Sequence, residues 1–228
     1  MYEAADRARV GDTSYFSALT PVELDTLVAA KDEDGRTLLH SAAANGHQEL
    51  LELLAHAGAG KVVNKADDEG WTPLHSAASA GHERVVGALL ALGAAPDAAT
   101  TSGATALHYA ASKGHAGIVR ALIGAGARVD ARDGTGSTPL HRAAATGKSE
   151  AACALLDEGR ARVDAHDKSG ATPLLVAVGC QQPNLALLLA SRGADLAAAN
   201  KEGQTPIGIA GPLAPALQQA AGGDAMET

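Results

Sequence analysis

The sequence predicts an all-α solenoid of seven stacked units, including N- and C-terminal caps, in which the repeating element is a β-turn finger followed by two helices. A threonine recurs with spacings of 35, 33, 33, 34 and 33 residues, at Thr37, Thr72, Thr105, Thr138, Thr172 and Thr205. A glycine always lies two residues before it, and an alanine always lies five residues after it. The 228 residues include only 1 Trp, 3 Tyr and 1 Phe, so alanine and leucine must fill the core. A fixed period of this length is typical of stacked repeats.

The residue types within one period explain a turn and two antiparallel helices. The glycine suits a turn with positive φ, and an acidic or amide residue three positions earlier can accept hydrogen bonds from the turn backbone. The threonine suits the N-cap of the first helix, and the proline that often follows suits its first position. A second glycine then ends the short, alanine-rich first helix, as at Gly81. The repeat therefore resembles the ankyrin repeat, and this resemblance implies a concave binding face.

The repeat positions divide the chain into seven units of one array. Residues 1–31 lack the turn and are expected to cap the N-terminus, with helices over 2–10 and 12–19 and another beginning at the Thr20-Pro21-Val22-Glu23 capping box. The complete repeats are expected at 32–66, 67–99, 100–132, 133–166 and 167–199. Residues 200–228 should form a short, imperfect C-terminal cap with a frayed tail beyond Gly222.

Three irregularities interrupt the pattern. Two extra residues fall near residues 58–61, and one falls near Arg160. Gln181 stands where the other repeats have the glycine that ends the first helix. A non-glycine residue in the left-handed conformation costs about 1 kcal/mol. We therefore expect that this turn is either rebuilt or locally weak.

Composition excludes several classes of function. The net charge of -8 argues against general affinity for nucleic acid. No apolar run approaches the roughly 20 residues needed to span a bilayer. Two cysteines without Cys-x-x-Cys spacing and no visible targeting segment favour a soluble intracellular protein with reduced thiols. We expect a monomer.

Nine histidines raise the question of metal binding or catalysis. Seven of them occupy two repeated positions, at His40, His75, His108 and His141 and at His47, His82 and His115. Such repetition favours structural roles for both sets, and for the first set these are hydrogen bonds to the neighbouring turn backbone. Cys153 is expected to be a buried small hydrophobic residue. No catalytic motif or zinc spacing is present, so the sequence predicts no enzyme, no metal site and no cofactor.

A protein-binding surface is the remaining hypothesis. Residues 1–100 hold 15 acidic and 7 basic side chains, whereas residues 101–228 hold 11 of each. The groove should therefore be acidic over its first three units and carry isolated cations near its middle. The candidate partner-binding residues are Arg36, Asp67, Asp68, Glu69, Trp71, Ser76, Tyr109, Lys113 and Arg142. Trp71 and Tyr109 are the expected hot spots; alternatively, Trp71 packs on a neighbouring turn and the acidic tips are merely solvated.

The match goes beyond the general repeat. The runs 67–81, 106–113, 141–145 and 200–202, with Trp71, Tyr109, Lys113 and Arg142 among them, resemble the gankyrin family of proteasome assembly chaperones. The resemblance implies binding to the C-terminal domain of one ATPase subunit of the proteasome regulatory particle. It also implies that the acidic turn tips meet basic residues of that domain, while Lys113 and Arg142 meet its carboxylates. The expected location is the cytoplasm and nucleus.

One segment departs from the animal members of that family. They carry a Leu-x-Cys-x-Glu motif linked to binding the retinoblastoma protein, and residues 176–180 here read Val-Ala-Val-Gly-Cys. That interaction is therefore not expected. The alternative to a chaperone is a generic ankyrin scaffold or adaptor with an unrelated partner.

Overall fold

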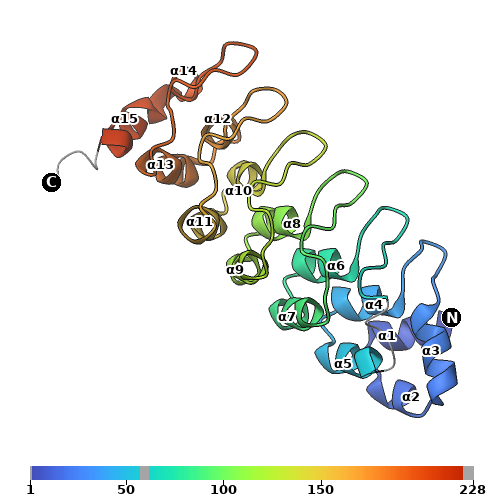
Figure 1. Ribbon diagram of the computed structural model, residues 1–228. Helices are drawn as coiled ribbons and strands as arrows, with labels where there is room; N and C mark the ends of the chain where they lie inside the picture. The colour runs from blue at the N-terminus through green and yellow to red at the C-terminus, as the bar shows by residue number, and fades with distance from the viewer. Residues whose placement is uncertain (1, 57–61, 223–228) are drawn as a thin grey trace. The chain divides into compact units, whose positions relative to one another are not determined.

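The computed structural model describes residues 2–56 and 62–222, and within them the chain is all-α, with helices joined by long turns (Figure 1). This confirms the predicted fold class. A single isolated bridge pairs Ala99 with Thr105 in the described part. The expected insertion near residues 58–61 and the expected frayed tail beyond Gly222 both lie outside the described residues.

The helices follow the predicted alternation. The N-terminal cap holds α1 (Tyr2–Arg9), α2 (Thr13–Ser17) and α3 (Pro21–Ala29). The first helices of the repeats are α4 (Leu38–Ala44), α6 (Pro73–Ala80), α8 (Ala106–Lys113), α10 (Pro139–Thr146), α12 (Pro173–Gly179) and α14 (Pro206–Ile209). The second helices are α5 (Gln48–His56), α7 (Glu83–Ala91), α9 (Ala116–Gly124), α11 (Ser149–Cys153), α13 (Pro183–Ser191) and α15 (Ala214–Gly222).

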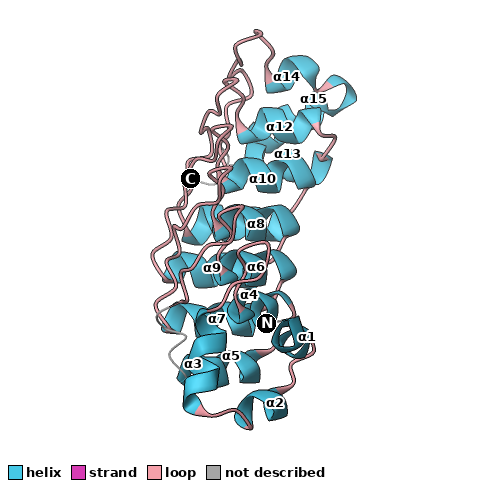
Figure 2. Cartoon of the chain, turned by 90° about the vertical axis from the view of Figure 1, so that its right-hand side faces the viewer, coloured by secondary structure: helices cyan, strands magenta, loops and turns pink. Residues whose placement is uncertain are grey.

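The chain forms two compact units, which are described separately below. The first unit comprises residues 1–106 and 124–127, and the second comprises residues 107–123 and 128–228. Within each unit the turns lie on one side of the helices (Figure 2). The core of each unit lies between its helices and is built mainly from alanine and leucine.

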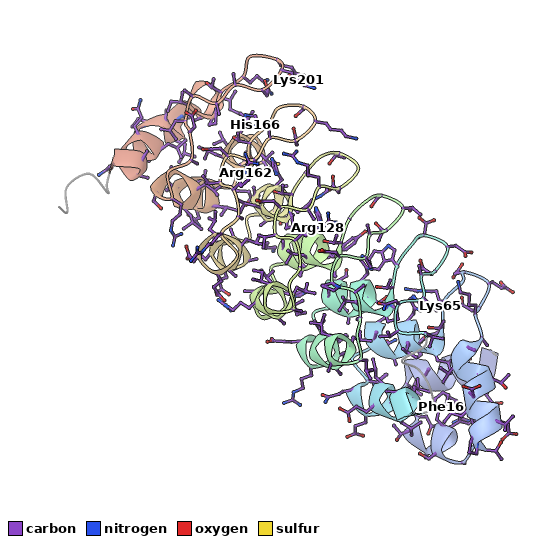
Figure 3. All side chains as sticks on the ribbon, in the orientation of Figure 1. Phe16, Lys65, Arg128, Arg162, His166 and Lys201 are labelled. Atoms are coloured by element: carbon purple, nitrogen blue, oxygen red, sulfur yellow. The ribbon has the colours of Figure 1, made fainter. Side chains whose placement is uncertain are left out.

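The N-terminal cap agrees with the sequence except in the length of its second helix. Gly11 follows α1 with a φ of 72°. Asp12 caps α2, which ends at Ser17, so it is shorter than expected. Phe16 is fully buried among the helices of this cap (Figure 3). The capping box at α3 is confirmed, because the N–H of Thr20 donates to Oε2 of Glu23 at 2.9 Å.

The extra residue of the fifth repeat is absorbed by a π-helical turn. The segment η2 (Ala154–Glu158) continues α11, and the N–H of Gly159 donates to the carbonyl of Ala154. Arg160 then takes a positive φ of 55°. A single inserted residue commonly forms such a bulge within an α-helix. The helix thus widens by one residue before the chain returns to the repeat.

Gln181 does not cause the turn to be rebuilt. Its φ is 55°, the left-handed conformation that the glycines adopt at the same position in other repeats, such as 87° at Gly81. The C-terminal cap is short, as expected. Its first helix, α14, has four residues, and the 3₁₀ turn η3 (Gly211–Leu213) follows before α15.

Candidate protein-binding surface

Each turn that begins with Asp or Asn is closed by the side chain of that residue. Oδ1 of Asp67 accepts hydrogen bonds from the N–H groups of Glu69 at 3.1 Å and Trp71 at 2.8 Å. Oδ1 of Asp133 does the same for its own turn. Asp32, Asp167 and Asn200 repeat the arrangement. The expected turn-closing role of these residues is confirmed.

Neighbouring turns are also bonded to each other through the backbone. In the first unit the N–H of Asp68 donates to the carbonyl of Asp34, and that of Thr101 donates to the carbonyl of Glu69, both at 3.0 Å. In the second unit the backbone N–H of Lys201, at the tip of the last turn (Figure 3), donates to the carbonyl of Ser169 at 2.9 Å. This ladder holds the tips side by side within each unit.

The exposed carboxylates of the first unit lie on this ladder. Asp34, Asp68 and Glu69 are exposed and form no ion pair within residues 2–56 and 62–222. Their negative charge is therefore available to a partner. Asp67 differs, because its side chain is only 8% exposed and closes the turn.

Arg36 lies beside Asp67. Its Nε is 3.5 Å from Oδ2 of Asp67, and this buried atom forms no hydrogen bond in the described part of the chain. The side chain of Arg36 remains 40% exposed. Part of its guanidinium group can therefore contact a partner, while Asp67 holds the other part.

The backbone of Trp71 takes part in two hydrogen bonds, and its side chain is half-buried. Its N–H donates to Asp67, and its carbonyl oxygen lies 2.9 Å from Nε2 of His40. The indole ring lies 6.0 Å from the ring of His75, tilted by 52°. The indole thus both packs within its own repeat and offers surface to a partner, so neither of the two roles expected for Trp71 is eliminated.

Ser76 is buried, contrary to the expectation from the sequence. The sequence placed it on the open binding face, but it is only 5% exposed, and its Oγ is buried without a hydrogen-bond partner among the described residues. A serine is short enough for neighbouring side chains to close over it in this alanine-rich packing. Ser76 is therefore not accessible for direct contact.

The second unit holds the other candidate residues. Tyr109 and Lys113 lie four residues apart on α8 and so share one helix face. Tyr109 is half-buried. Lys113 is exposed and forms no ion pair with any described residue. These two side chains offer an aromatic surface beside a positive charge.

Arg142 is not the isolated cation that the sequence suggested. Its Nε donates to Oδ2 of Asp133 at 2.9 Å, and its Nη2 bonds the same oxygen. Burial alone would raise the pKa of Asp133, but hydrogen bonds from Thr135 and Arg142 outweigh it and lower the pKa. Arg142 keeps 43% of its side chain exposed, so it can still contact a partner as half of an ion pair.

The repeated histidines are structural, as predicted. In His75 the Nδ1 atom accepts the N–H of Thr72 at 3.1 Å, which leaves the ring proton on Nε2, 3.3 Å from the carbonyl of Ala104. His40, His108 and His141 reach the next turn in the same way. Burial lowers the pKa of all four, that of His75 to about 4. His47 and His82 bond the carbonyls of Arg9 and Ala44.

Other candidate chemistry is sparse. Cys153 is only partly buried, which corrects the expectation of a buried residue, and Cys180 is exposed; both thiols are free. Across the described ranges no three His, Cys, Asp or Glu side chains group in a way that could hold a metal ion. Nor does that part of the chain contain a helix with the length and apolarity needed to cross a membrane.

Comparison with known families agrees with the repeat geometry. The family model described as ankyrin repeats (3 copies) matches residues 17–99, 39–133, 88–165 and 125–200. The chain belongs to the ankyrin-repeat family. Proteins of this family are generally scaffolds that bind other proteins. No curated protein matches the chain.

Two features of the surface were not found from the sequence. The pairing of Arg142 with Asp133 was missed, although an arginine nine residues after a turn aspartate was a visible signal. The burial of Ser76 was missed because the repeat pattern gives the helix face of a residue but not the size of its neighbours.

Proposed function

We propose that the chain binds another protein through its turn tips and the adjoining ends of its first helices. The observation that carries this proposal is the set of exposed carboxylates of Asp34, Asp68 and Glu69, which form no ion pair with the described residues and are held on a bonded ladder beside the half-buried Trp71. Preorganised charge beside a large aromatic side chain is typical of protein interfaces.

The charges define the partner's chemistry. The tips of the first unit are negative, so they fit lysine and arginine side chains. In the second unit Lys113 is exposed and unpaired among the described residues, and Arg142 is half of an ion pair. These residues fit a carboxylate. The expected partner therefore carries a basic patch and, separately, an acidic one.

The partner that we propose is the C-terminal domain of one ATPase subunit of the proteasome regulatory particle. The chain would then act as an assembly chaperone, in the cytoplasm and nucleus. The support is the resemblance to the gankyrin family at Trp71, Tyr109, Lys113 and Arg142. The ankyrin-repeat family alone supports equally well a scaffold or adaptor with an unrelated partner.

A charge-reversal experiment distinguishes the proteasome chaperone from a scaffold with an unrelated partner. The purified ATPase domain is tested in a pull-down at low salt, where charge complementarity is least screened. Wild type should bind, and the double variant Asp68→Lys, Glu69→Lys should not. The control Asp25→Lys, Glu83→Lys makes the same change in net charge at exposed helical positions and should bind normally.

The alternative outcomes are distinct. Absence of binding by wild type at low salt would eliminate the proteasome subunit as partner. The scaffold function would be favoured if wild type and the Asp68→Lys, Glu69→Lys variant (the tip variant) both bind the ATPase domain while the variant loses a different interaction. Compensating charge reversals on the ATPase domain should restore binding to the tip variant if the contact is direct.

A further inference from the structure

The C-terminal end of the second unit contains an apolar hollow of about 770 Å³. Its lining includes the apolar residues Val178, Ile209 and Leu213 and the polar residues Gln181 and Gln182. Among the residues that the structure describes, no charged side chain lines it. Ile209 is 40% exposed, which is unusual for a large hydrophobic residue in this chain.

The preceding repeats show what normally covers this position. A side chain of the next repeat packs against the glycine that ends the first helix, so that a Cβ built on Gly46 would lie 2.7 Å from Nδ1 of His82. His47 lies against Gly11 in the same way, and Gln182 against Gly147. The cover is always the loop between the two helices of the following repeat.

The cover also supplies a hydrogen bond. At Gly11 and Gly46 the carbonyl two residues earlier accepts a side-chain donor from the covering loop: Arg9 from His47 at 2.8 Å, and Ala44 from His82 at 3.0 Å. In the second unit the carbonyl of Ser112 accepts the hydroxyl of Thr146 at 2.9 Å. These repeat interfaces thus combine a close side-chain contact on the glycine with one donor, whereas at Gly147 the covering Gln182 donates to the carbonyl of Cys180 in its own loop.

The last repeat lacks both parts of this cover. The carbonyl in question belongs to Gly179, and the residues in the two donor positions are Leu213 and Pro215, whose side chains cannot donate. Pro183, four residues after Gly179, has no N–H to offer either. Because α14 stops after four residues, the hollow stays open where a complete first helix would end.

The exposure of the Gln181 side chain is consistent with a position that the last repeat does not cover. A Cβ built on the equivalent glycines, such as Gly46 and Gly147, would lie less than 3.0 Å from a side chain of the next repeat. Gln181 is exposed. The residue that looked anomalous in the sequence is therefore a consequence of the incomplete last repeat.

We propose that this hollow is a second protein-binding site, which accepts a helix end and loop from another protein. The occupant presents an apolar turn to Ile209 and Val178 and an uncharged or histidine side-chain donor to the carbonyl of Gly179. It takes the place of the covering loop that the last repeat does not supply. This surface is independent of the turn tips.

A second copy of this chain does not fit. The segment that would stack is the loop after α1, which carries Asp12 in the donor position. Its carboxylate already accepts the hydroxyl of Ser14 at 2.6 Å and an N–H of Arg7 at 2.9 Å. A carboxylate facing a carbonyl oxygen would repel it.

The test uses a fluorescent peptide that copies residues 72–91, the helix–loop–helix segment that covers Gly46, stapled within its first helix. Anisotropy titration against the full chain should show saturable binding. Ile209→Lys should weaken it at least tenfold, whereas Val22→Lys, the same change at an exposed valine of the N-terminal cap, should leave it unchanged. A His82→Ala peptide should bind more weakly, because it lacks the donor.

Amide NMR spectra of the chain locate the bound peptide. Shifts at Gly179–Gln182 and Ile209–Leu213 support the site, and shifts confined to other residues overturn it. Failure to saturate below about 1 mM also overturns the proposal. So does concentration-dependent dimerisation that Ile209→Lys abolishes, which would make a second copy the occupant, or peptide binding that appears only after residues 223–228 are removed.

Discussion

Protonation of the buried histidines should make the fold sensitive to mild acid, and His75 allows the effect to be calculated. Its Nδ1 accepts the N–H of Thr72, and its Nε2 reaches the carbonyl of Ala104. A proton added to Nδ1 would face the Thr72 N–H and break the helix cap. The charged ring would also be buried, which is the main reason that its pKa falls to about 4.

The direction in which stability changes with pH follows from the pKa values of His75 in the folded and the unfolded chain. The pKa of His75 in the unfolded chain is about 6.5, above the value of about 4 in the folded chain, so the unfolded chain binds the proton first as pH falls. The stability is complete above about pH 6.5 and decreases down to about pH 4. At about 1.4 kcal/mol per pKa unit the full loss is about 3 kcal/mol, of which about 2 kcal/mol is lost by pH 5.

The measurement is urea unfolding followed by circular dichroism at pH 7 and pH 5. His40, His108 and His141 have lowered pKa values and act in the same direction. The lowered pKa values of the Asp12, Glu23 and Asp133 carboxyl groups do not interfere, because these groups change stability only at still lower pH.

The chain itself supplies the test variant. The sixth repeat has Leu175 in place of the histidine, and there Oγ1 of Thr172 accepts the N–H of Leu175 at 3.2 Å. His75→Leu should cost about 2 kcal/mol at pH 7 for two lost hydrogen bonds, but its stability should fall about 2 kcal/mol less than that of wild type between pH 7 and pH 5. The exposed His166→Leu is the control. If His75→Leu loses stability as steeply as wild type, the titration of His75 is not the cause.

Three further predictions concern single side chains. Trp71→Ala should weaken partner binding by about 2 kcal/mol with little change in unfolding, measured by calorimetric titration and urea denaturation; normal binding with weaker folding would make Trp71 structural. Gln181→Gly should raise the melting temperature by about 2 to 4 °C by removing about 1 kcal/mol of strain, whereas Gln182→Gly, at a φ of -107°, should not. Asp133→Asn should destabilise the fold at pH 7 more than at pH 3, since the depressed pKa of Asp133 stabilises only above its usual range; equal losses at both pH values would contradict this.

The repeat itself could be predicted from the sequence because each of its parts depends on local chemistry. A threonine N-cap, a proline at the first helical position and a glycine with positive φ act within a few residues. The helices α6 and α10 begin at Pro73 and Pro139, as those signals indicate. The hydrogen bonds of the histidines were also predictable, since one residue type recurred at one position.

Other features could not be predicted because they depend on contacts between repeats. Whether Ser76 is covered depends on the side chains around it, and the pattern of one repeat does not contain them. The conformation of Gln181 could not be predicted for the same reason, because it depends on the neighbouring repeat. The rule that a left-handed position needs glycine gave two outcomes, and only the missing cover of the last repeat explains why the conformation persists there.

The structure also separates two kinds of carboxylate that the sequence treated alike. Asp67 and Asp133 close their turns through Oδ1 and hold an arginine through Oδ2, so both oxygens are in use. Replacing either residue would disturb the turn before it affected a partner. Asp68 and Glu69 contribute only backbone groups to the ladder, and their side chains are exposed. Charge at those two positions can therefore vary without loss of the fold, so changes in partner choice should arise there.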